Sequence, residues 1–562
     1  MSKYVFCLFI AFLSLNLDGY CQSSVHKLEQ TIDAAYKKVY PACVELFAYD
    51  TVARQQAGGQ FSGVVVSKDG YILTAAHVAT PGVVYKATFP DGSSCLVKGL
   101  GKIEFAEDKT RPDAAMLKII SAGSWPYAEM ANSDALRTFE PCISLSYPEG
   151  LRQSKPILRF GYVLIAQNER GFVKSTCEME PGDSGGPLFD YLGRLIGIHS
   201  AIEIPETDNY DVPVNIYRKY WDALKKPEVY TKLPEMTDEV SKDPFSRSIM
   251  TIPALKDGQF FKHTRDAYNN NCFFVESDTA GKKSTVAGTL FSLKKVATKH
   301  TMSCVIASKS SLVGEHPVIL NKNEGKVNAT VIARDKSTDL VLLMPETAIA
   351  GGIIYTPALE DSLKISAGVF LISAQPDRTG IVSISGSAPF SLPKITSGGF
   401  LGLGFKSKLA PLLVGYVFPN LNESIYKIKT GDEITGIGKD TVTDFESFLH
   451  LLTPYWAGDT VQVKIKREGH DFIETVVLDT LPQRHFNHPA EMFAGGKSMR
   501  RDGFNKVFTH DAIIKPYQCG GPVFDMNGDF YGLNIARYSR VSTLALPAIV
   551  VYAFIKDHLS TN

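Results

Sequence analysis

The sequence lacks an excess of charge of either sign, since 59 Lys and Arg residues balance 59 Asp and Glu residues. Proteins that bind nucleic acids usually carry a clear basic excess, so nothing in the composition predicts such a partner. The chain also lacks any CxxC pair, the spacing typical of structural zinc sites. We therefore expect neither a metal site nor a cofactor.

Long apolar runs are absent apart from one near the N-terminus. Lys3 precedes an apolar run over residues 4–17, and Gly19-Tyr20-Cys21 offers a cleavage site before Gln22. The run is too short to span a bilayer comfortably but suits a signal peptide. We expect residues 1–21 to be removed, and the mature protein to be periplasmic or extracellular rather than an integral membrane protein.

Cysteines are few, and their number is informative. Of nine in all, Cys7 and Cys21 belong to the expected signal segment, which leaves seven. Because seven is odd, at least one thiol is unpaired within the chain.

The remaining composition favours a β-rich protein of several domains. At 562 residues the chain exceeds what one core supports. Its 45 glycines and 30 prolines, beside many Val, Ile, Tyr and Phe residues, favour short strands joined by turns.

One glycine-rich stretch carries the strongest chemical signal. Residues 180–190 read EPGDSGGPLFD, with Ser184 between glycines. Glycine allows the sharp turn that would aim the backbone amides of Gly182 and Ser184 at one point, as an oxyanion hole requires. The alternative is an ordinary glycine-rich hairpin turn.

A serine nucleophile needs a base and an orienting carboxylate, and both are present upstream. His77 ends a T-A-A-H run after two β-rich runs joined at Lys68-Asp69-Gly70, and Asp113 begins an apolar strand. The order His77, Asp113, Ser184 suits two successive β-barrels with the site between them.

The segments SGVVVSKDGYILTAAHV, PDAAMLKI and PGDSGGPLFDYLGRLIGIHSAI resemble the protease domain of the HtrA (Deg) family of chymotrypsin-like serine proteases. The resemblance implies a catalytic triad of His77, Asp113 and Ser184 in a domain over residues 26–225. It also implies an oxyanion hole made by the Gly182 and Ser184 amides.

Other positions in this segment bear on specificity or depart from the family. Glu178 falls at the position where related proteases set their first-pocket specificity. A carboxylate there would favour a basic residue before the scissile bond. Ser200 is also expected to bind substrate. Asp183 and His199 each stand where the family usually has asparagine.

Residues 226–260 are predicted to be a linker, after which the first pattern returns over 261–395 and 490–562. Residues 288–302 repeat the His77 hairpin, Asp339 repeats Asp113, and Cys519 replaces Ser184. Counting from the shared threonine places Thr301 at the His77 position, with His300 one residue early. Tyr517 replaces the oxyanion glycine. We expect a degenerate, scaffolding repeat; the alternative makes Cys519 a second nucleophile.

The second repeat is interrupted by an insertion over residues 396–482 that resembles a PDZ domain. Phe400, Leu401, Gly402 and Leu403 resemble the loop that binds a peptide carboxylate, and residues 444–452 have the helical spacing of the groove helix. A generic αβ insertion is the alternative. His485 and His488 follow, too few for a metal site.

The predicted fold class is mainly β: two chymotrypsin-like double β-barrels, the second carrying an inserted small α+β PDZ domain. The resemblance implies a serine endopeptidase of protein quality control that acts on unfolded or misfolded polypeptides and selects C-terminal peptides. The alternative is a non-catalytic peptide-binding scaffold. Oligomeric state does not follow from the sequence.

Overall fold

The computed structural model describes residues 23–104, 111–151, 153–236, 248–279, 281–293, 304–321, 325–355, 364–377, 379–482 and 488–559. The predicted signal segment therefore lies outside the described residues. The chain forms two compact units. The first holds the residues up to Phe390, His488–Lys497 and those from Lys506 on, and the second holds the intervening segments.

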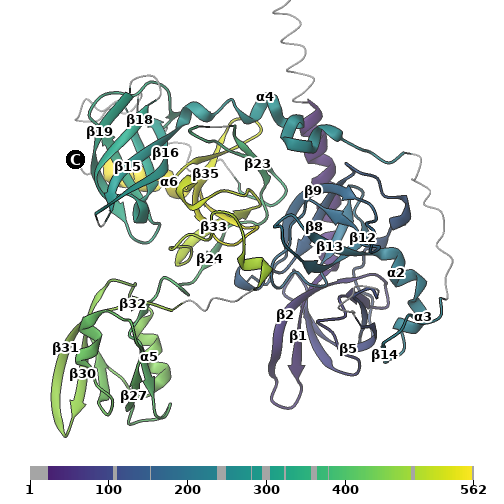
Figure 1. Ribbon diagram of the computed structural model, residues 1–562, viewed down its shortest axis with the longest axis horizontal. Coiled ribbons are helices and arrows are strands. Elements are labelled where there is room, and N and C mark those ends of the chain that lie inside the picture. Colours follow the sequence, from purple (N-terminus) through teal and green to yellow (C-terminus); the bar gives the residue numbers. More distant parts are fainter. Residues whose placement is uncertain are drawn as a thin grey trace, which may run out of the picture. The chain divides into compact units, whose positions relative to one another are not determined.

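The first unit begins with a closed β-barrel (Figure 1). Its strands pair antiparallel around the ring in the order β1, β2, β3, β6, β5, β4, and β4 returns to β1. Their bounds are β1 Cys43–Asp50, β2 Gln55–Val65, β3 Tyr71–Thr74, β4 Val84–Thr88, β5 Ser94–Ile103 and β6 Ala114–Ile119.

A second barrel follows in the order β10, β9, β8, β11, β12, β13, and a bridge between Val173 and Asp211 joins its two ends. The strand bounds are β7 Glu129–Met130, β8 Pro141–Ser146, β9 Ile157–Ile165, β10 Lys174–Ser175, β11 Pro187–Asp190, β12 Arg194–Ile202 and β13 Asn209–Pro213. Short helices and one further strand complete the repeat: α2 Val214–Lys219, α3 Trp221–Leu224 and β14 Val229–Tyr230, the last pairing with β5.

The same plan recurs in the second repeat, after η4 (Pro253–Phe261) and α4 (Lys262–Arg265). Strands β15 to β20 close a barrel in the order β15, β18, β19, β20, β17, β16. Its bounds are β15 Cys272–Thr279, β16 Lys282–Ser292, β17 Cys304–Lys309, β18 Glu315–Asn321, β19 Gly325–Asp335 and β20 Leu340–Pro345, with β21 Ile353–Ile354 beside β16.

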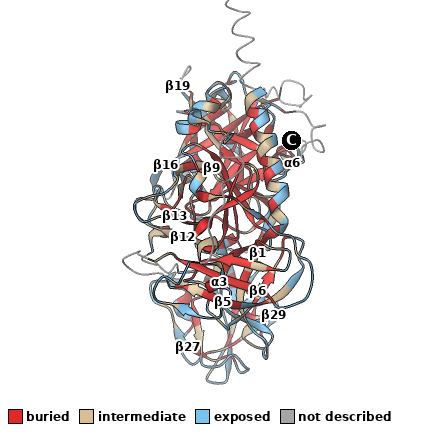
Figure 2. Cartoon of the chain, turned by 90° about the vertical axis from the view of Figure 1, so that its right-hand side faces the viewer, coloured by how far each residue is buried: buried red, intermediate tan, exposed pale blue. Residues whose placement is uncertain are grey.

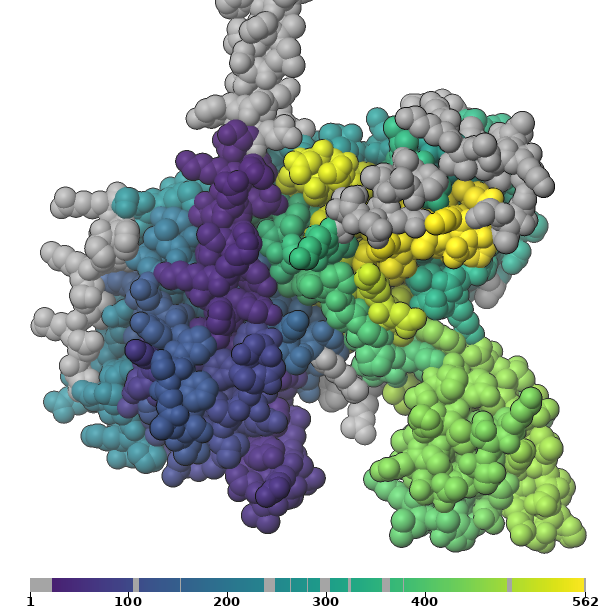
Figure 3. Space-filling model, turned by 180° about the vertical axis from the view of Figure 1, so that it is seen from behind, coloured from purple at the N-terminus to yellow at the C-terminus, as the bar shows by residue number. Residues whose placement is uncertain are grey.

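The last barrel of this unit is built from two parts of the chain that are far apart in sequence. Strand β22 pairs with β34, so that residues near 370 lie beside residues near 525, visible as green against yellow in Figure 3. The order is β23, β22, β34, β35, β36, β33, with bounds β22 Phe370–Ser373, β23 Ile381–Ile384, β33 Phe504–His510, β34 Pro522–Asp525, β35 Phe530–Arg537 and β36 Thr543–Pro547; helix α6 (Ala548–Leu559) follows.

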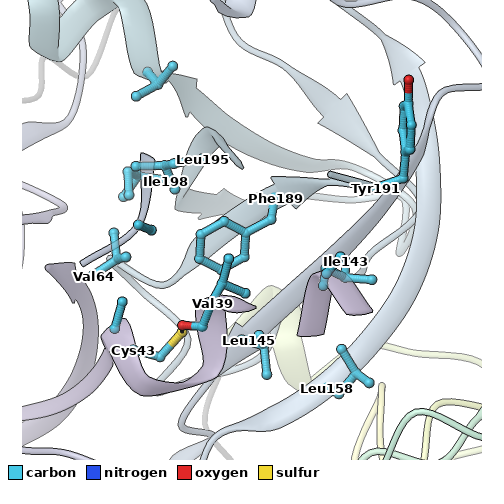
Figure 4. Packing of buried hydrophobic residues seen from close by; sticks show 14 of the residues in the cluster. Val39, Cys43, Val64, Ile143, Leu145, Leu158, Phe189, Tyr191, Leu195 and Ile198 are labelled. Carbon is cyan, nitrogen blue, oxygen red and sulfur yellow. The ribbon is translucent and has the colours of Figure 1, made fainter. Parts of the chain in front are cut away.

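Apolar side chains fill the barrels, as the buried strands in Figure 2 show. Phe189, fully buried on β11, lies in a core with Val64, Leu195 and Ile198 (Figure 4). A helix over residues 23–39 covers this core with one apolar face, of which Val39 is part. The strand that follows the predicted nucleophile is thus fixed on both sides.

The second unit has its own core, formed by a four-stranded sheet, shorter strand pairs and one helix. Helix α5 (Phe445–Leu452) begins at Asp444, whose carboxylate accepts from the Ser447 amide. The strands are β25 Gly399–Phe400, β26 Leu403–Phe405, β27 Val414–Val417, β28 Glu433–Ile437, β29 Asp440–Thr441, β30 Thr460–Arg467, β31 His470–Val477 and β32 Asp479–Thr480, and β24 (Phe390–Leu392) lies where the chain enters this unit.

The predicted fold class of chymotrypsin-like double barrels is confirmed. The PDZ assignment of the second unit stays a prediction. Among the described helices, none combines the length and apolar character needed to cross a bilayer.

Candidate active site

His77 lies just past the end of β3, at the rim of the first barrel. Its imidazole Nδ1 is 2.6 Å from Asp113 Oδ2, and its backbone amide donates to Asp113 Oδ1 at 2.9 Å. The side chain is 39% exposed while that of Asp113 is 1% exposed, so one edge of the ring faces solvent and the other faces a buried carboxylate.

Asp113 precedes β6, which pairs with β3, and this pairing brings the carboxylate to the histidine. Ser200, on β12 of the second barrel, donates its hydroxyl to Asp113 Oδ2 at 2.8 Å. Two barrels thus hold one aspartate, whose acceptors fix the orientation and tautomer of His77.

Ser184 Oγ lies 3.0 Å from His77 Nε2. The structure therefore brings together all three residues of the predicted triad, from the segment after β3, the residue before β6 and the loop before β11. A serine within hydrogen-bond distance of an oriented histidine is the arrangement that activates the hydroxyl as a nucleophile.

The loop around Ser184 depends on two glycines with positive φ, Gly182 at +96° and Gly185 at +82°. A Cβ at Gly185 would overlap the Thr74 side chain and the Ser62 carbonyl, so the loop packs directly on the first barrel. Ser62 also donates its hydroxyl to the Gly182 carbonyl at 2.8 Å.

The backbone amides of Gly182 and Ser184 donate no hydrogen bond to any acceptor in the described ranges. The neighbouring amides are used: Asp183 donates to the Glu180 carbonyl, and Gly185 to the His199 carbonyl. Two free donors beside the Ser184 hydroxyl are what an oxyanion requires.

The two predicted substrate-binding residues of this repeat differ in environment. Ser200 contacts Asp113, as described above. Glu178 is largely buried, and burial raises its pKa to about 7, although the nearby guanidinium of Arg540 opposes the shift. Its Oε2 has no hydrogen-bond partner among the described residues. Substrate binding by either residue stays a prediction.

The two departures from the family pattern are both buried. His199 lies between Ser144, 2.5 Å from Nε2, and Asp211, 2.5 Å from Nδ1. All three are fully buried, so this network joins strands of the second barrel and faces no substrate.

Asp183 pairs with Arg159, whose Nη1 is 2.5 Å from Asp183 Oδ2. Sequence reasoning did not identify Arg159. The available signal was a single charged residue in the apolar run ILRFGYVLI of β9, together with a carboxylate beside the nucleophile that needed a partner.

Among its described residues, the second repeat has a serine where the first repeat has His77. Ser308 Oγ donates to the Ala287 carbonyl as Thr74 Oγ1 does to the Ser62 carbonyl, which makes these positions equivalent. Three residues on, Ser311 takes the place of His77 and donates its amide and hydroxyl to Asp339.

Thr301 and His300, which the count from the shared threonine placed at and beside the His77 position, lie outside the described residues. The hydrogen bonds of Ser308 and Ser311 instead place Ser311 at the position equivalent to His77. The connection from β16 to β17 runs from Ser292 to Cys304, far longer than that from β2 to β3, so counting from the shared threonine fails.

Asp339, the predicted equivalent of Asp113, forms an ion pair with a lysine. Asp339 is 2.7 Å from the buried Lys309 Nζ, which also donates to the Ile535 carbonyl. Cys519 follows the 3-10 turn η10 (Pro516–Gln518) and is fully buried. None of the seven described cysteines forms a disulfide.

In the second unit, the predicted carboxylate loop lies beside helix α5. Phe400 to Leu403 line a pocket of about 270 Å³ together with Phe445, Phe448, Leu449 and Leu452. Gly402 has a φ of +63°, and the amides of Leu401 and Gly402 donate to no acceptor within the described ranges. Among described residues no group of three metal-ligating side chains occurs.

The first repeat is similar in sequence to known serine proteases. Residues 61–198 match the model of the trypsin-like peptidase domain. The periplasmic serine endoprotease DegP of Escherichia coli K12 is 29% identical over 198 residues, which cover 32% of this chain and 40% of that protein.

Two further relatives give the same result. The putative serine protease HhoB of Synechocystis is 29% identical over 34% of this chain and 47% of that protein. A probable DegP-like periplasmic serine endoprotease of Pseudomonas fulva is 29% identical, over 34% of this chain and 40% of that protein. The chain thus spans less than half the length of these relatives. The resemblance to HtrA/Deg serine proteases is confirmed, and the matches support a serine-type endopeptidase.

Proposed function

We propose that the chain is an exported, periplasmic serine endopeptidase that cleaves unfolded polypeptides through an acyl-enzyme formed on Ser184. One observation carries the proposal: Ser184, His77 and the buried Asp113 form a continuous series of contacts beside two free backbone amides. The relatives named above, which are described as periplasmic serine endoproteases, support the compartment and the cleavage of polypeptides.

In this mechanism His77 Nε2 takes the proton of Ser184 as its Oγ attacks the scissile carbonyl carbon. The Gly182 and Ser184 amides donate to the oxyanion that results. Asp113 stabilises the imidazolium, which then gives its proton to the leaving amine. Water repeats the sequence on the acyl-enzyme, and Ser184 is regenerated.

The test is hydrolysis of reduced, unfolded casein by wild type, Ser184→Ala and Cys519→Ser. Loss of a triad serine lowers turnover by on the order of a million-fold, so Ser184→Ala should be inactive. Cys519→Ser changes the equivalent residue of the second repeat and should keep the wild-type rate. Full activity in Ser184→Ala, or loss of activity only in Cys519→Ser, would overturn the proposal.

We also propose that the second unit is a PDZ module that binds the C-termini of polypeptides. The pocket between Leu403 and helix α5 suits an apolar terminal side chain, and the free amides of Leu401 and Gly402 suit a carboxylate. The exposed edge of β26 would pair with the peptide backbone.

The binding test compares a C-terminal peptide carrying a free carboxylate with its amidated form. Leu449, 49% exposed, lines the pocket, whereas Leu409, 74% exposed, does not. Leu449→Lys should weaken binding at least about tenfold, which is about 1.4 kcal/mol, and Leu409→Lys should not. Equal binding of the amidated peptide would contradict carboxylate recognition.

A further inference from the structure

A buried cluster of charges surrounds the loop that carries Gly182. Arg159, only 2% exposed, contacts Asp183 through Nη1 at 2.5 Å and Glu180 through Nη2 at 3.2 Å. These two carboxylates flank the Pro181-Gly182 pair on either side. Ions buried in this way are tolerated only when their geometry and hydrogen bonds are well satisfied.

The cluster also joins the two ends of the loop segment from Glu180 to Asp183. Asp183 Oδ2 also accepts from the Glu180 amide at 2.8 Å, and Asp183 Oδ1 accepts from the Ser146 hydroxyl at 2.8 Å. The path of the chain from Glu180 to Asp183, and with it the direction of the Gly182 amide, therefore depends on where the Glu180 and Asp183 carboxylates are held.

The second repeat reaches this loop with one short segment, residues 538–542 between β35 and β36, here called the buttress segment. Ser542 donates its hydroxyl to Glu180 Oε1 at 3.0 Å. The Arg540 guanidinium, fully buried, donates from Nη1 to the Met179 carbonyl at 3.0 Å. The buttress segment thus contacts two consecutive residues just before Gly182.

The buttress segment also contacts the first repeat on two further sides. Arg540 donates to Asn209 Oδ1 at 3.2 Å and to the Glu206 carbonyl. Tyr538 donates its hydroxyl to the carbonyl of Gly150, next to Glu149. The Glu149 amide in turn donates to the Pro181 carbonyl at 3.0 Å, so this contact also ends at the Gly182 loop.

Strand β9, which supplies Arg159, is held by the second repeat as well. The residue before Arg159, Leu158, donates its amide to the Gly386 carbonyl at 3.0 Å. The residue after it, Phe160, donates its amide to Asp511 Oδ2 at 3.0 Å. Both ends of the Arg159–Glu180 contact are therefore bonded to the second repeat.

We propose that the second repeat is a built-in positioning partner of the first, and that Arg540 and Ser542 hold residues 178–182 in the geometry that presents the Gly182 amide to the oxyanion. The inference rests on the proposed endopeptidase function. Arg540 and Ser542 touch neither substrate nor the Ser184 hydroxyl in this role; they act through Met179, Glu180 and Arg159.

The experiment measures turnover per functional active site in the full-length protein. A fluorophosphonate reagent, which labels an activated serine, counts functional sites, and cleavage of a peptide substrate gives kcat and KM. The variants are Arg540→Met, Arg540→Lys and Ser542→Ala. The matched control is Arg334→Met, because Arg334 is exposed and its bonds within the described part of the chain go to Ser310 and Gly314 of its own repeat.

Loss of one oxyanion donor lowers kcat by about 10²–10³-fold, and Arg540→Met should approach that range at fixed KM for each labelled site. Ser542→Ala should lower kcat by about tenfold. Arg540→Lys should lower kcat less than Arg540→Met does, because lysine keeps the positive charge but offers fewer hydrogen-bond donors than arginine. The control should match wild type.

A peptide boronic acid gives an independent readout, since its tetrahedral adduct places an oxygen at the oxyanion position. Its affinity should fall by the same factor as kcat/KM, as expected for a transition-state analogue. If the variants merely lose labelled sites while turnover per site and boronate affinity stay at wild-type values, the second repeat only stabilises the fold and the inference is wrong. A Ser184→Ala protein that still cleaves the peptide would instead contradict the proposed function.

Discussion

At the scale of single residues, the region around the active site contains carboxyl groups whose pKa is raised by burial. Burial raises the pKa of Glu178 to about 7 and that of Asp511 to about 6, against ordinary values near 4. Both groups therefore bind protons more tightly in the folded chain than in the unfolded chain. Stability gained from a raised carboxyl pKa is present at low pH and lost as the pH rises through the folded value.

This loss of stability with rising pH gives a prediction for Glu178→Gln. Near pH 5 the wild-type carboxyl is protonated and resembles the amide, so the two proteins should have similar free energies of unfolding. Near pH 8.5 the wild type carries a buried charge, and the variant should be the more stable by up to about 3 kcal/mol. Urea unfolding at both pH values measures the difference.

The control for this prediction is the exposed Glu235→Gln, whose difference from wild type should not change with pH. A Glu178→Gln difference that is equally independent of pH would contradict the raised pKa.

At the scale of the element, the loop from Glu180 to Gly186 requires that residue 182 carry no side chain. A Cβ on Gly182 would lie closer than van der Waals contact to the Glu149 amide and the Tyr147 carbonyl, at a φ of +96°. Gly171 also has positive φ, +81°, but its nearest neighbour would be 3.9 Å away.

Gly182→Ala should therefore displace the loop and lower kcat by about 10²-fold or more, as loss of an oxyanion donor does. Gly171→Ala carries the same backbone strain in open space, costs roughly 1 kcal/mol of stability, and should leave kcat unchanged. Steady-state kinetics with thermal unfolding of both variants separates the two effects, and equal kcat values would contradict the prediction.

The same loop shows how far the sequence predicted the site. His77, Asp113 and Ser184 were predictable because each lies in a local pattern whose residue types fit one chemistry. The Glu180–Ser542 contact was not, since it joins residues 362 positions apart through the packing of two repeats. No local pattern in the chain reports such a contact.

Loop length explains the failure in the second repeat. Counting along the sequence made Thr301 the equivalent of His77 because both follow similar β-rich runs. In the second repeat's barrel, the residue at the equivalent position is Ser311. Hydrogen bonds of Ser308 and Asp339, not sequence spacing, establish the equivalence. The double-barrel fold itself was predictable, since alternating apolar residues and glycine turns recur in both repeats.

At the scale of the whole molecule, each compact unit buries its own core, so the chain should unfold in more than one step. Ile465 in the second unit and Ile319 in the first are both fully buried on strands. Replacing either with alanine should cost about 2–5 kcal/mol, and each should lower a different transition in calorimetry. A single transition lowered equally by both substitutions would contradict independent units.

The contacts of the buttress segment with Met179 and Glu180 have a consequence for how the protein is made. During synthesis the first repeat leaves the ribosome hundreds of residues ahead of the buttress segment that completes its active-site loop. A nascent chain at that stage would thus carry His77, Asp113 and Ser184 without the contacts of Arg540 and Ser542 to residues 179 and 180. Under the positioning role proposed for Arg540 and Ser542, the Gly182 amide reaches its final orientation only after the buttress segment has been synthesised and packed against the first repeat.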